Sequence, residues 1–403
     1  MCTKLVPRIR NLITPGFLIL VTIMLQTACA SNIESRVIDD QTPTESLIAE
    51  ISTQLPEPTN TPTPTLTPSL TATPTQTATH TPTATPVVIS ETNADQLQIH
   101  FSWEGPSETC WKNVCSGVIK FSPDGRLIAT ASSDNIIRIW RVEDWTLIQE
   151  LEGHTDRIND IAFSPDSEEI ASSSSDATTL VWQIDDGSIL NTIESAGGKA
   201  LAVAYSHSSE LLAIANQVCT ITLWDFATNA PQDSIQIMDS CQGGRAWSLV
   251  FSTDDNFLIS ASVAGGNNTW RILPLATGVE IPYLYRHTYG YFYDMAISND
   301  GNLTAAVSDA VFRPKVIRFE PREIWDHYEG HTGKVLQVDF SPDGQLLLTG
   351  SVDNTVRLWR VIDGENLAIL DDLSDWIVSI DFSNRGDYIA ALSLDGTFII
   401  WGP

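Results

Sequence analysis

Apolar and polar residues alternate in a pattern that repeats along most of the chain. Seven times, an aromatic or aliphatic residue is followed directly by serine, at intervals of 42, 42, 46, 46, 43 and 42 residues. The pairs are Phe121-Ser122, Phe163-Ser164, Tyr205-Ser206, Phe251-Ser252, Ile297-Ser298, Phe340-Ser341 and Phe382-Ser383. Such a period, filled with short apolar runs and turn signals, is typical of four-stranded propeller blades. The pattern predicts an all-β, seven-bladed β-propeller.

The first repeat shows how one unit is built. Alternating and β-branched runs predict four strands, over residues 117–121, 127–132, 136–142 and 147–151. The first two runs are separated by a Ser-Pro-Asp-Gly turn at residues 122–125, in which Asp bonds the backbone and Gly takes a positive φ. Each repeat is therefore predicted to be a small antiparallel sheet.

Two repeats carry the same four side chains at the same spacing. The sets are His154, Ser172, Asp176 and Trp182 in the second repeat, and His331, Thr349, Asp353 and Trp359 in the sixth. In both, the Asp lies four residues after the hydroxyl group and the Trp six residues after the Asp. These repeats resemble the blades of WD-repeat β-propellers, over roughly residues 97–403. The resemblance implies that each set forms a hydrogen-bonded tetrad.

The other repeats depart from this pattern. The first keeps the hydroxyl, Asp and Trp but has no Gly-His pair, and the seventh has Ala391 and Leu373 at two of the four positions. The fourth and fifth depart furthest, so their borders between residues 254 and 330 stay open.

The two ends of the repeat region predict how the ring closes. The last repeat stops after its third strand, whereas the alternating segment 97–101 precedes the first repeat and belongs to no other blade. We expect this segment to complete the last blade as its outer strand, because pairing removes an open sheet edge.

The N-terminal residues have the pattern of an export signal. Three basic residues precede an apolar stretch over 17–25 and a run of small residues that ends at Ala30. No later stretch is long and apolar enough to span a bilayer. Residues 25–29 resemble a bacterial lipoprotein processing site, which implies lipidation of Cys29. Cleavage after Ala30 without lipidation, and a retained membrane anchor, are the alternatives.

A Thr/Pro-rich tract separates this signal from the repeats. It has almost no large apolar residues, so it cannot bury a core and is predicted to be a disordered, extended linker. The predicted domains are a signal over residues 1–29, a linker over 30–94 and the propeller over 95–403.

Four cysteines lie beyond the signal, and in an oxidising compartment they allow three pairings. Their positions in the predicted loops favour Cys110 with Cys115 and Cys219 with Cys241. A zinc site is the alternative, but no histidine completes a ligand cluster with common spacing. No metal and no cofactor is therefore predicted.

The charge of the chain bears on its partners. The net charge of −28 falls to about −31 when the three basic signal residues are removed. Such a surface repels phosphate, so nucleic acid is not an expected ligand. Solubility outside the cell explains most of the acidity, and a monomer is expected.

One set of positions runs against this acidity. Six residues before each repeated apolar residue, where the chain begins the innermost strand, four of seven residues are basic. With the neighbouring aromatic residues, the predicted partner-binding rim is Arg157, Lys199, Arg245, Trp247, Tyr291, Tyr293, Lys334 and Trp376. In WD-repeat proteins this rim commonly contacts partners, and a mixture of Trp, Tyr and Arg suits a binding hot spot. The alternative is that the basic residues pair with Asp156, Asp160 and Asp339.

Enzyme motifs are missing from the sequence. It has no P-loop, no Gly-x-Ser-x-Gly elbow and no His-Glu-x-x-His pair. Four histidines without a structural role, His100, His207, His287 and His327, have no partner at a recognisable spacing. No catalytic residue is therefore predicted.

Two functions are compatible with these features. The first is an extracytoplasmic scaffold, held at a membrane by an N-terminal lipid or signal anchor, that binds a protein or anionic ligand through one face of the propeller. The alternative is an exported hydrolase or lyase with a site at the channel mouth. A fold alone does not decide between them.

Overall fold

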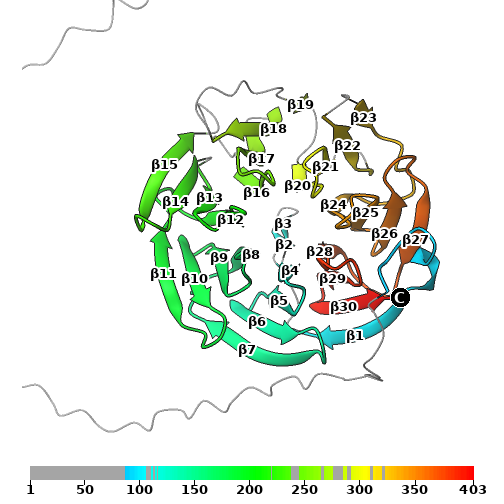
Figure 1. Ribbon diagram of the computed structural model, residues 1–403, viewed down its shortest axis with the longest axis horizontal. Coiled ribbons are helices and arrows are strands. Elements are labelled where there is room, and N and C mark those ends of the chain that lie inside the picture. The colour runs from blue at the N-terminus through cyan, green and yellow to red at the C-terminus, as the bar shows by residue number, and fades with distance from the viewer. Residues whose placement is uncertain are drawn as a thin grey trace, which may run out of the picture. The chain divides into compact units, whose positions relative to one another are not determined.

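Seven four-stranded antiparallel sheets are arranged in a ring around a central axis (Figure 1). The computed structural model describes residues 87–105, 110–111, 114–115, 117–218, 220–236, 245–264, 267–275, 285–287, 292–308, 312–319 and 323–403. The predicted all-β, seven-bladed propeller is confirmed. Cys29 and the predicted signal lie outside the described residues.

In the first three blades, four consecutive strands run from the axis outward. Blade 1 consists of β4 (Val118–Phe121), β5 (Leu127–Ala131), β6 (Ile136–Arg141) and β7 (Thr146–Glu152). Blade 2 consists of β8 (Ile158–Phe163), β9 (Glu169–Ser174), β10 (Thr178–Gln183) and β11 (Ile189–Glu194). Blade 3 consists of β12 (Ala200–Tyr205), β13 (Leu211–Asn216), β14 (Thr220–Asp225) and β15 (Ala230–Gln236).

The next three blades repeat this order. Blade 4 consists of β16 (Arg245–Phe251), β17 (Phe257–Ala264), β18 (Asn267–Pro274) and β19 (Tyr285–His287). Blade 5 consists of β20 (Phe292–Ile297), β21 (Leu303–Ser308), β22 (Lys315–Arg318) and β23 (Glu323–Trp325). Blade 6 consists of β24 (Val335–Phe340), β25 (Leu346–Ser351), β26 (Val356–Arg360) and β27 (Asn366–Leu370).

Blade 7 combines strands from both ends of the repeat region. Its inner strands are β28 (Ile377–Phe382), β29 (Ile389–Ser393) and β30 (Thr397–Gly402), and its outer strand is β1 (Gln98–Glu104). β1 pairs antiparallel with β30, and Trp103 lies opposite Phe398. The chain that forms the outer edge of blade 7 thus continues into blade 1, which joins the two ends of the ring (Figure 1).

Residues just before β1 also pack on the ring. Ile89 and Ala94 are each 2% exposed in a hydrophobic cluster with blades 6 and 7, and η1 (Ala94–Gln96) is a short 3-10 helix. The Ile89 amide donates to the Gly386 carbonyl at 2.7 Å, and the Glu91 carboxylate lies 2.9 Å from the Arg360 guanidinium. The ordered segment therefore begins before residue 95, within the range assigned from the sequence to the linker.

The repeated serine has one role in most blades. It is buried at all seven positions, with at most 9% exposure. In blade 1, the Ser122 hydroxyl donates to Asp124 at 2.6 Å and accepts the Leu127 amide at 2.9 Å, so it holds the turn that joins β4 to β5. The fourth turn residue has a positive φ in every blade, at Gly125, Ser167, Ser209, Asp255, Gly301, Gly344 and Gly386. The period in the sequence is therefore the period of this turn.

The core is divided among the junctions between blades. The described residues form seven hydrophobic clusters, and each joins two neighbouring blades. The cluster between blades 7 and 1 is rich in aromatic rings, with Phe101, Trp103 and Phe398 around Trp140. Because Phe101 and Trp103 belong to β1, ring closure contributes to the core as well as to the sheet.

Candidate partner-binding rim and central channel

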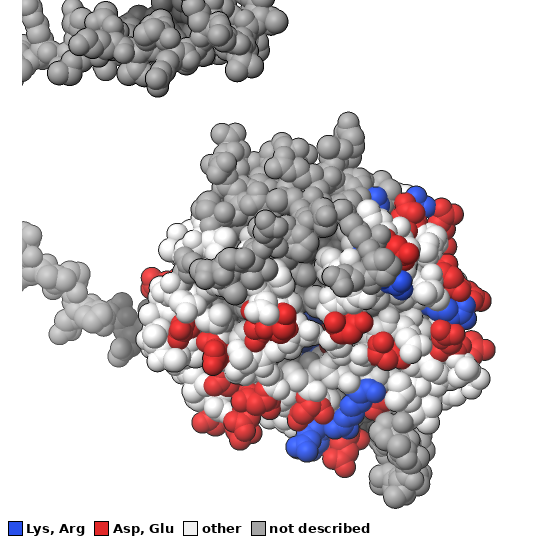
Figure 2. Space-filling view, turned by 45° about the horizontal axis from the view of Figure 1, so that its top comes forward, with Lys and Arg blue, Asp and Glu red and all other residues white. Residues whose placement is uncertain are grey.

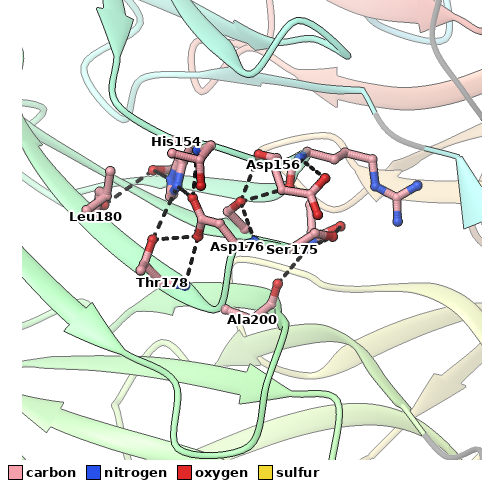
Figure 3. A network of polar contacts seen from close by, with 12 residues as sticks. His154, Asp156, Ser175, Asp176, Thr178, Leu180 and Ala200 are labelled. Atoms are coloured by element: carbon pink, nitrogen blue, oxygen red, sulfur yellow. Dashed lines mark hydrogen bonds and ion pairs between the residues drawn. The ribbon is translucent and has the colours of Figure 1, made fainter. Parts of the chain in front are cut away.

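The four side chains singled out in blade 2 form one hydrogen-bonded network. Figure 3 shows His154 and Asp176 within it. His154 lies between Asp176 and Ser172, with 2.8 Å from Nδ1 to the carboxylate and 2.7 Å from Nε2 to the hydroxyl. The Trp182 indole donates to the same hydroxyl at 2.9 Å. The network connects the loop between β7 and β8, which carries His154, to β9, to β10 and to the turn between them. It therefore fixes the position of this loop.

Blade 6 repeats this arrangement. His331 Nδ1 lies 2.9 Å from Asp353 and Nε2 lies 2.7 Å from the Thr349 hydroxyl. The Trp359 indole donates to Thr349 at 2.8 Å. Burial, with the nearby positive charge of Arg357, lowers the pKa of His331 despite Asp353, so its ring stays neutral near pH 7.

The tetrad carboxylates are held ionised by their donors. Burial opposes the charge on Asp176, but hydrogen bonds from Thr178, Thr155 and His154 outweigh it and lower the pKa to about 2. The pKa of Asp353 is likewise lowered, because donors on His331, Thr355 and Thr332 outweigh burial. Both tetrads are therefore stable arrangements of one anion among several donors.

Blades 1 and 7 use substitutes that the sequence pattern did not predict. In blade 1, which lacks the histidine, the Arg138 guanidinium bonds Asp134 at 2.6 Å, and Trp140 still donates to Thr130 at 3.2 Å. In blade 7, where Ala391 replaces the hydroxyl, the Trp401 indole donates to Asp372 at 2.8 Å. Asp372 occupies the position of the glycine in the Gly-His pair, so neither partner could be identified by spacing.

The predicted rim positions share one backbone environment. Arg157, Lys199, Lys334 and Trp376 each lie directly before the innermost strand of a blade. The carbonyl of each accepts an amide from the turn after the second strand of its blade, at 2.8 to 3.0 Å. The backbone is therefore held in the same way at each position, while the side chain changes from Arg or Lys to Trp.

The rest of the predicted rim is described only in part. Tyr293 is a half-buried residue of β20 that packs against the cluster between blades 5 and 6. Arg245 and Trp247 lie in β16, but their side chains, like all of Tyr291, lie outside the described part of the chain.

Two rim residues share a small apolar pocket of about 200 Å³. Lys334 and Trp376 line it together with Phe312, Leu336, Val352 and Gly333. Phe312 belongs to the loop between β21 and β22 and is 48% exposed. Sequence spacing did not indicate Phe312, because it comes from blade 5 whereas Lys334 and Trp376 come from blades 6 and 7. The pocket can accept one apolar side chain beside a lysine ammonium group.

The alternative pairing of basic rim residues with acidic neighbours is seen at Lys199. The Lys199 ammonium lies 3.7 Å from the Asp156 carboxylate, and both side chains are about half exposed. Asp160 and Asp339 instead accept backbone amides from the next blade, Val203 at 3.0 Å and Phe382 at 2.8 Å. A surface ion pair of this kind contributes little to stability, so Lys199 can exchange its partner at low cost.

A channel of about 1730 Å³ runs through the ring and is lined by the innermost strands. Four aspartates, Asp160, Asp294, Asp339 and Asp381, and Lys120 face it. We call these four groups the channel carboxylates. Outside the channel, acidic side chains are spread over the visible face, with Lys and Arg in fewer places (Figure 2).

Of the histidines considered as acid-base groups, His100, His207 and His327 lie apart from one another, and the side chain of His287 lies outside the described residues. His100 lies on β1 against Tyr388, and His327 stacks on Tyr328. His207 bonds Asp255 at 3.3 Å in the turns of blades 3 and 4. Within the described residues, no group of three or more His, Cys, Asp or Glu side chains could hold a metal ion. These histidines therefore form no common site in the described part of the chain, and the polar cluster that the hydrolase or lyase alternative would need is the one in the channel, Asp160, Asp294, Asp339, Asp381 and Lys120.

Two of the four cysteines have a described backbone. Cys110 and Cys115 are direct partners in a two-stranded ladder of β2 (Cys110–Trp111) and β3 (Val114–Cys115). These strands project onto the centre of the ring in Figure 1. Cys219 and Cys241 lie outside the described residues.

Comparison with known proteins finds the same repeat. The family model described as "WD domain, G-beta repeat" matches residues 107–141, 145–183, 323–360 and 364–402. These segments correspond mainly to blades 1, 2, 6 and 7, with the last strand of blade 5 included.

Curated relatives match parts of the chain. Polycomb protein esc of Drosophila melanogaster is 29% identical over 174 residues, which cover 40% of each chain. An uncharacterized WD repeat-containing protein of Synechocystis is 30% identical over 160 residues, covering 40% of this chain and 44% of the relative. Transcription initiation factor TFIID subunit 5 of Caenorhabditis elegans is 39% identical over 74 residues, covering 18% and 11%. The matches thus span less than half the length of these relatives. Together with the seven four-stranded sheets, the four repeat matches support a WD-repeat β-propeller.

Proposed function

We propose that this propeller is a monomeric extracytoplasmic scaffold that binds a protein or other anionic partner through the rim. The observation that carries the proposal is the shared backbone geometry of Arg157, Lys199, Lys334 and Trp376, whose side chains nevertheless differ. A rigid frame that presents varied basic and aromatic side chains is a general feature of binding surfaces. WD-repeat relatives named as subunits of larger assemblies, such as the TFIID subunit, support a role in protein binding.

The rim pocket gives this surface a point of attachment. Trp376 and Phe312 provide aromatic area, and Lys334 places a positive charge beside them. A suitable partner has an apolar side chain next to an acidic residue. The apolar side chain would be buried in the pocket, and the acidic residue would pair with Lys334. Burying one such side chain contributes about 1.5–3 kcal/mol, so the pocket can act as a hot spot.

A pull-down with the tagged full-length chain from an envelope extract of the source organism tests this proposal. The test variant carries Lys334→Glu and Trp376→Ala, and the matched control carries Arg126→Glu. Arg126 follows the turn at the opposite end of an innermost strand, and its side chain is 77% exposed, so it makes the same charge change away from the rim. We expect a partner that the unaltered protein and the control retain and that the test variant loses by at least tenfold.

Equal recovery with all three proteins, at unchanged melting temperature, would contradict binding at the rim. A further variant, Arg157→Glu with Arg245→Glu, then extends the test to the rim of blades 2 and 4. If every variant retains the partner, the contact lies on another surface of the propeller.

We also propose that a lipid on Cys29 anchors the chain and that residues 30–86 act as a spacer. The sequence signals support this arrangement. Among the described residues, no helix is long and apolar enough to cross a membrane. Cys29→Ser should abolish incorporation of a radiolabelled fatty acid and release the protein from membranes. Lipidation of Cys29 would be refuted if the Cys29→Ser chain incorporated the fatty acid, or if the unaltered chain did not.

Finally, we propose a disulfide between Cys110 and Cys115. The two residues face each other in the β2–β3 ladder, and paired strands bring α-carbons within the range that a disulfide can bridge. Mass spectrometry of a non-reduced digest should recover residues 110 and 115 in one cross-linked peptide. Free thiols at both positions in freshly exported protein would contradict the assignment. The pair Cys219 and Cys241 is tested in the same digest.

A further inference from the structure

Each channel carboxylate joins its own blade to the next. Asp160 accepts the Val203 amide from blade 3 at 3.0 Å, and Asp294 accepts the Val338 amide from blade 6 at 3.1 Å. The same contact recurs from Asp339 to Phe382 at 2.8 Å and from Asp381 to Phe121 at 2.7 Å. Within the described residues, four junctions are therefore tied at the channel wall by a carboxylate and a backbone amide.

The junction at which the ring closes has additional contacts. Lys120 Nζ lies 3.1 Å from Asp381, and the Ser379 hydroxyl accepts the Ile119 amide at 3.1 Å. The Lys120 side chain keeps 38% exposure because it projects into the channel. Burial disfavours its charge, but Asp381, Asp339, Asp294 and Asp160 outweigh burial and raise its pKa, so it stays a cation.

This single ammonium group does not balance the channel. Four ionised carboxylates and one ammonium have a net charge of −3. Asp381 is neutralised by direct contact with Lys120, which leaves Asp160, Asp294 and Asp339 without a cation at contact distance among the described side chains. Like charges that share a low-dielectric wall repel one another, and a proton on a carboxylate removes that repulsion.

Bound protons are compatible with the junction contacts. Asp160 and Asp339 each use one oxygen for the amide of the next blade and the other for a local amide, Ile161 and Phe340, both at 2.9 Å. A carboxylate oxygen has two lone pairs, so an oxygen that accepts one amide can still bind a proton on the channel side. Protonation therefore removes charge without requiring the blades to separate.

We propose that the channel wall is a proton-responsive clasp, in which protonation of Asp160, Asp294 and Asp339 tightens the blade junctions as the solution changes from weakly alkaline to weakly acidic. Three bound protons change the charge of the wall from −3 to 0, and burial raises the pKa of Asp381 as well, although Lys120 opposes this. An exported protein is exposed to the external pH, so a clasp of this kind would make the rigidity of the binding frame depend on its surroundings.

The electrostatic environment agrees with this range. Burial raises the pKa of Asp160 to about 7 and that of Asp294 to about 6, although amide hydrogen bonds and Lys120 act in the opposite direction. Burial and the neighbouring Asp381 raise the pKa of Asp339 to about 7. A raised carboxyl pKa means that the folded state binds more protons than the unfolded state between about pH 4 and pH 7. Stability therefore falls as pH rises through this interval.

Other titratable groups at the channel have different partners. Among the described lining residues these are Tyr205, whose hydroxyl donates to Glu169 at 3.2 Å, His207, which bonds Asp255, and Tyr293. Burial and Glu169 raise the pKa of Tyr205, so it does not titrate below pH 8. Since His207 also lines the channel, His207→Gln is included as a control for this side chain.

The test measures titration and stability on the full-length chain. Carbon-detected NMR of aspartate carboxyl groups, assigned with Asp160→Asn and Asp339→Asn, follows each proton directly. In parallel, melting temperatures are measured from about pH 8.5 to about pH 5.5 for the unaltered chain, these two variants and His207→Gln. The matched control is Asp254→Asn, because the Asp254 carboxylate lies in a turn and bonds only Ser252 and Asn256 among the described residues.

We expect the melting temperature of the unaltered chain to rise on the order of 5 °C as pH falls from about 8.5 to about 6. Each Asn variant should lose roughly a third of that rise, whereas Asp254→Asn and His207→Gln should keep it. Lys120→Met should enlarge the rise, because the wall then loses its cation. Carboxyl midpoints near 4 in the unaltered chain would overturn the proposal whatever the variants do, as would parallel profiles for all proteins.

Discussion

The tetrads and the channel carboxylates are two polar networks that use the same side chain in opposite electrostatic states. Asp176 accepts hydrogen bonds from Thr178, Thr155 and His154, and its pKa falls to about 2. Asp160 accepts only two backbone amides in the described structure, and burial raises its pKa to about 7. The number of donors, and the distance to other anions, decides which effect prevails.

The tetrads and the channel carboxylates therefore have different structural roles. A tetrad holds one blade and its entering loop together, and its charge is satisfied locally. A channel carboxylate bonds the next blade and shares the channel with other anions, so the electrostatic repulsion that it causes acts on several blades. The carboxylates of the tetrads should stay ionised above about pH 4, whereas those of the channel should not.

Removing β1 should have the largest effect, because it opens the ring that both networks require. Deletion of residues 87–104 removes Phe101 and Trp103 from the core and leaves β30 as an open edge. We expect loss of a single cooperative unfolding transition, measured by urea denaturation followed by Trp fluorescence. Deletion of residues 1–86 is the control and should leave the transition unchanged. A normal transition after deletion of residues 87–104 would show that the contacts of Lys120 and Asp381 close the ring without β1.

Aspartate removal should differ sharply between the networks. Asp353→Ala leaves the donors on His331, Thr332 and Thr355 without their acceptor, so we expect a loss of about 3–5 kcal/mol in the free energy of unfolding at pH 8. Asp339→Ala also leaves two amides unpaired but removes one of four like charges, so a loss of about 1 kcal/mol or less is expected at the same pH. Equal losses of unfolding free energy in urea titrations would show that the tetrads and the channel carboxylates do not differ in this way.

Complete and incomplete tetrads should differ by a smaller amount. Ser172→Ala leaves His154 Nε2 and the Trp182 indole without their partner, whereas Thr130→Val affects the Trp140 indole. We expect losses of about 2–3 kcal/mol and about 1 kcal/mol, respectively. Thermal melts of both variants, with Thr179→Val as a buried control on a neighbouring strand, check this order. A larger loss in blade 1 would mean that Arg138 contributes more than the histidine it replaces.

Much of the fold was predictable because it depends on local, repeated chemistry. The turn of Ser122, Asp124 and Gly125 recurs in similar form in every blade, and a fixed turn at a fixed interval predicts the number of blades. The tetrads of blades 2 and 6 were identified for the same reason, since their members lie at constant separations. Arg138 and Asp372 were missed because they restore a tetrad bond from positions that the pattern leaves unspecified.

The sequence predicted where the rim lies but not all of the residues that form its pocket. Arg157, Lys199, Lys334 and Trp376 lie where the period places them, directly before the innermost strands. The pocket that Phe312 forms with Lys334 and Trp376 combines three blades, and no spacing within one repeat encodes that combination.

The sequence by itself determined the seven-bladed propeller and the spacing of its tetrads, because turns and strand patterns are encoded within about forty residues. Only the tertiary structure decided which carboxylates share the channel and which amides they accept. Asp339 and Phe382 lie 43 residues apart and meet only because successive blades pack side by side. Their protonation depends on burial and on neighbours from other blades, and these exist only after the ring has closed.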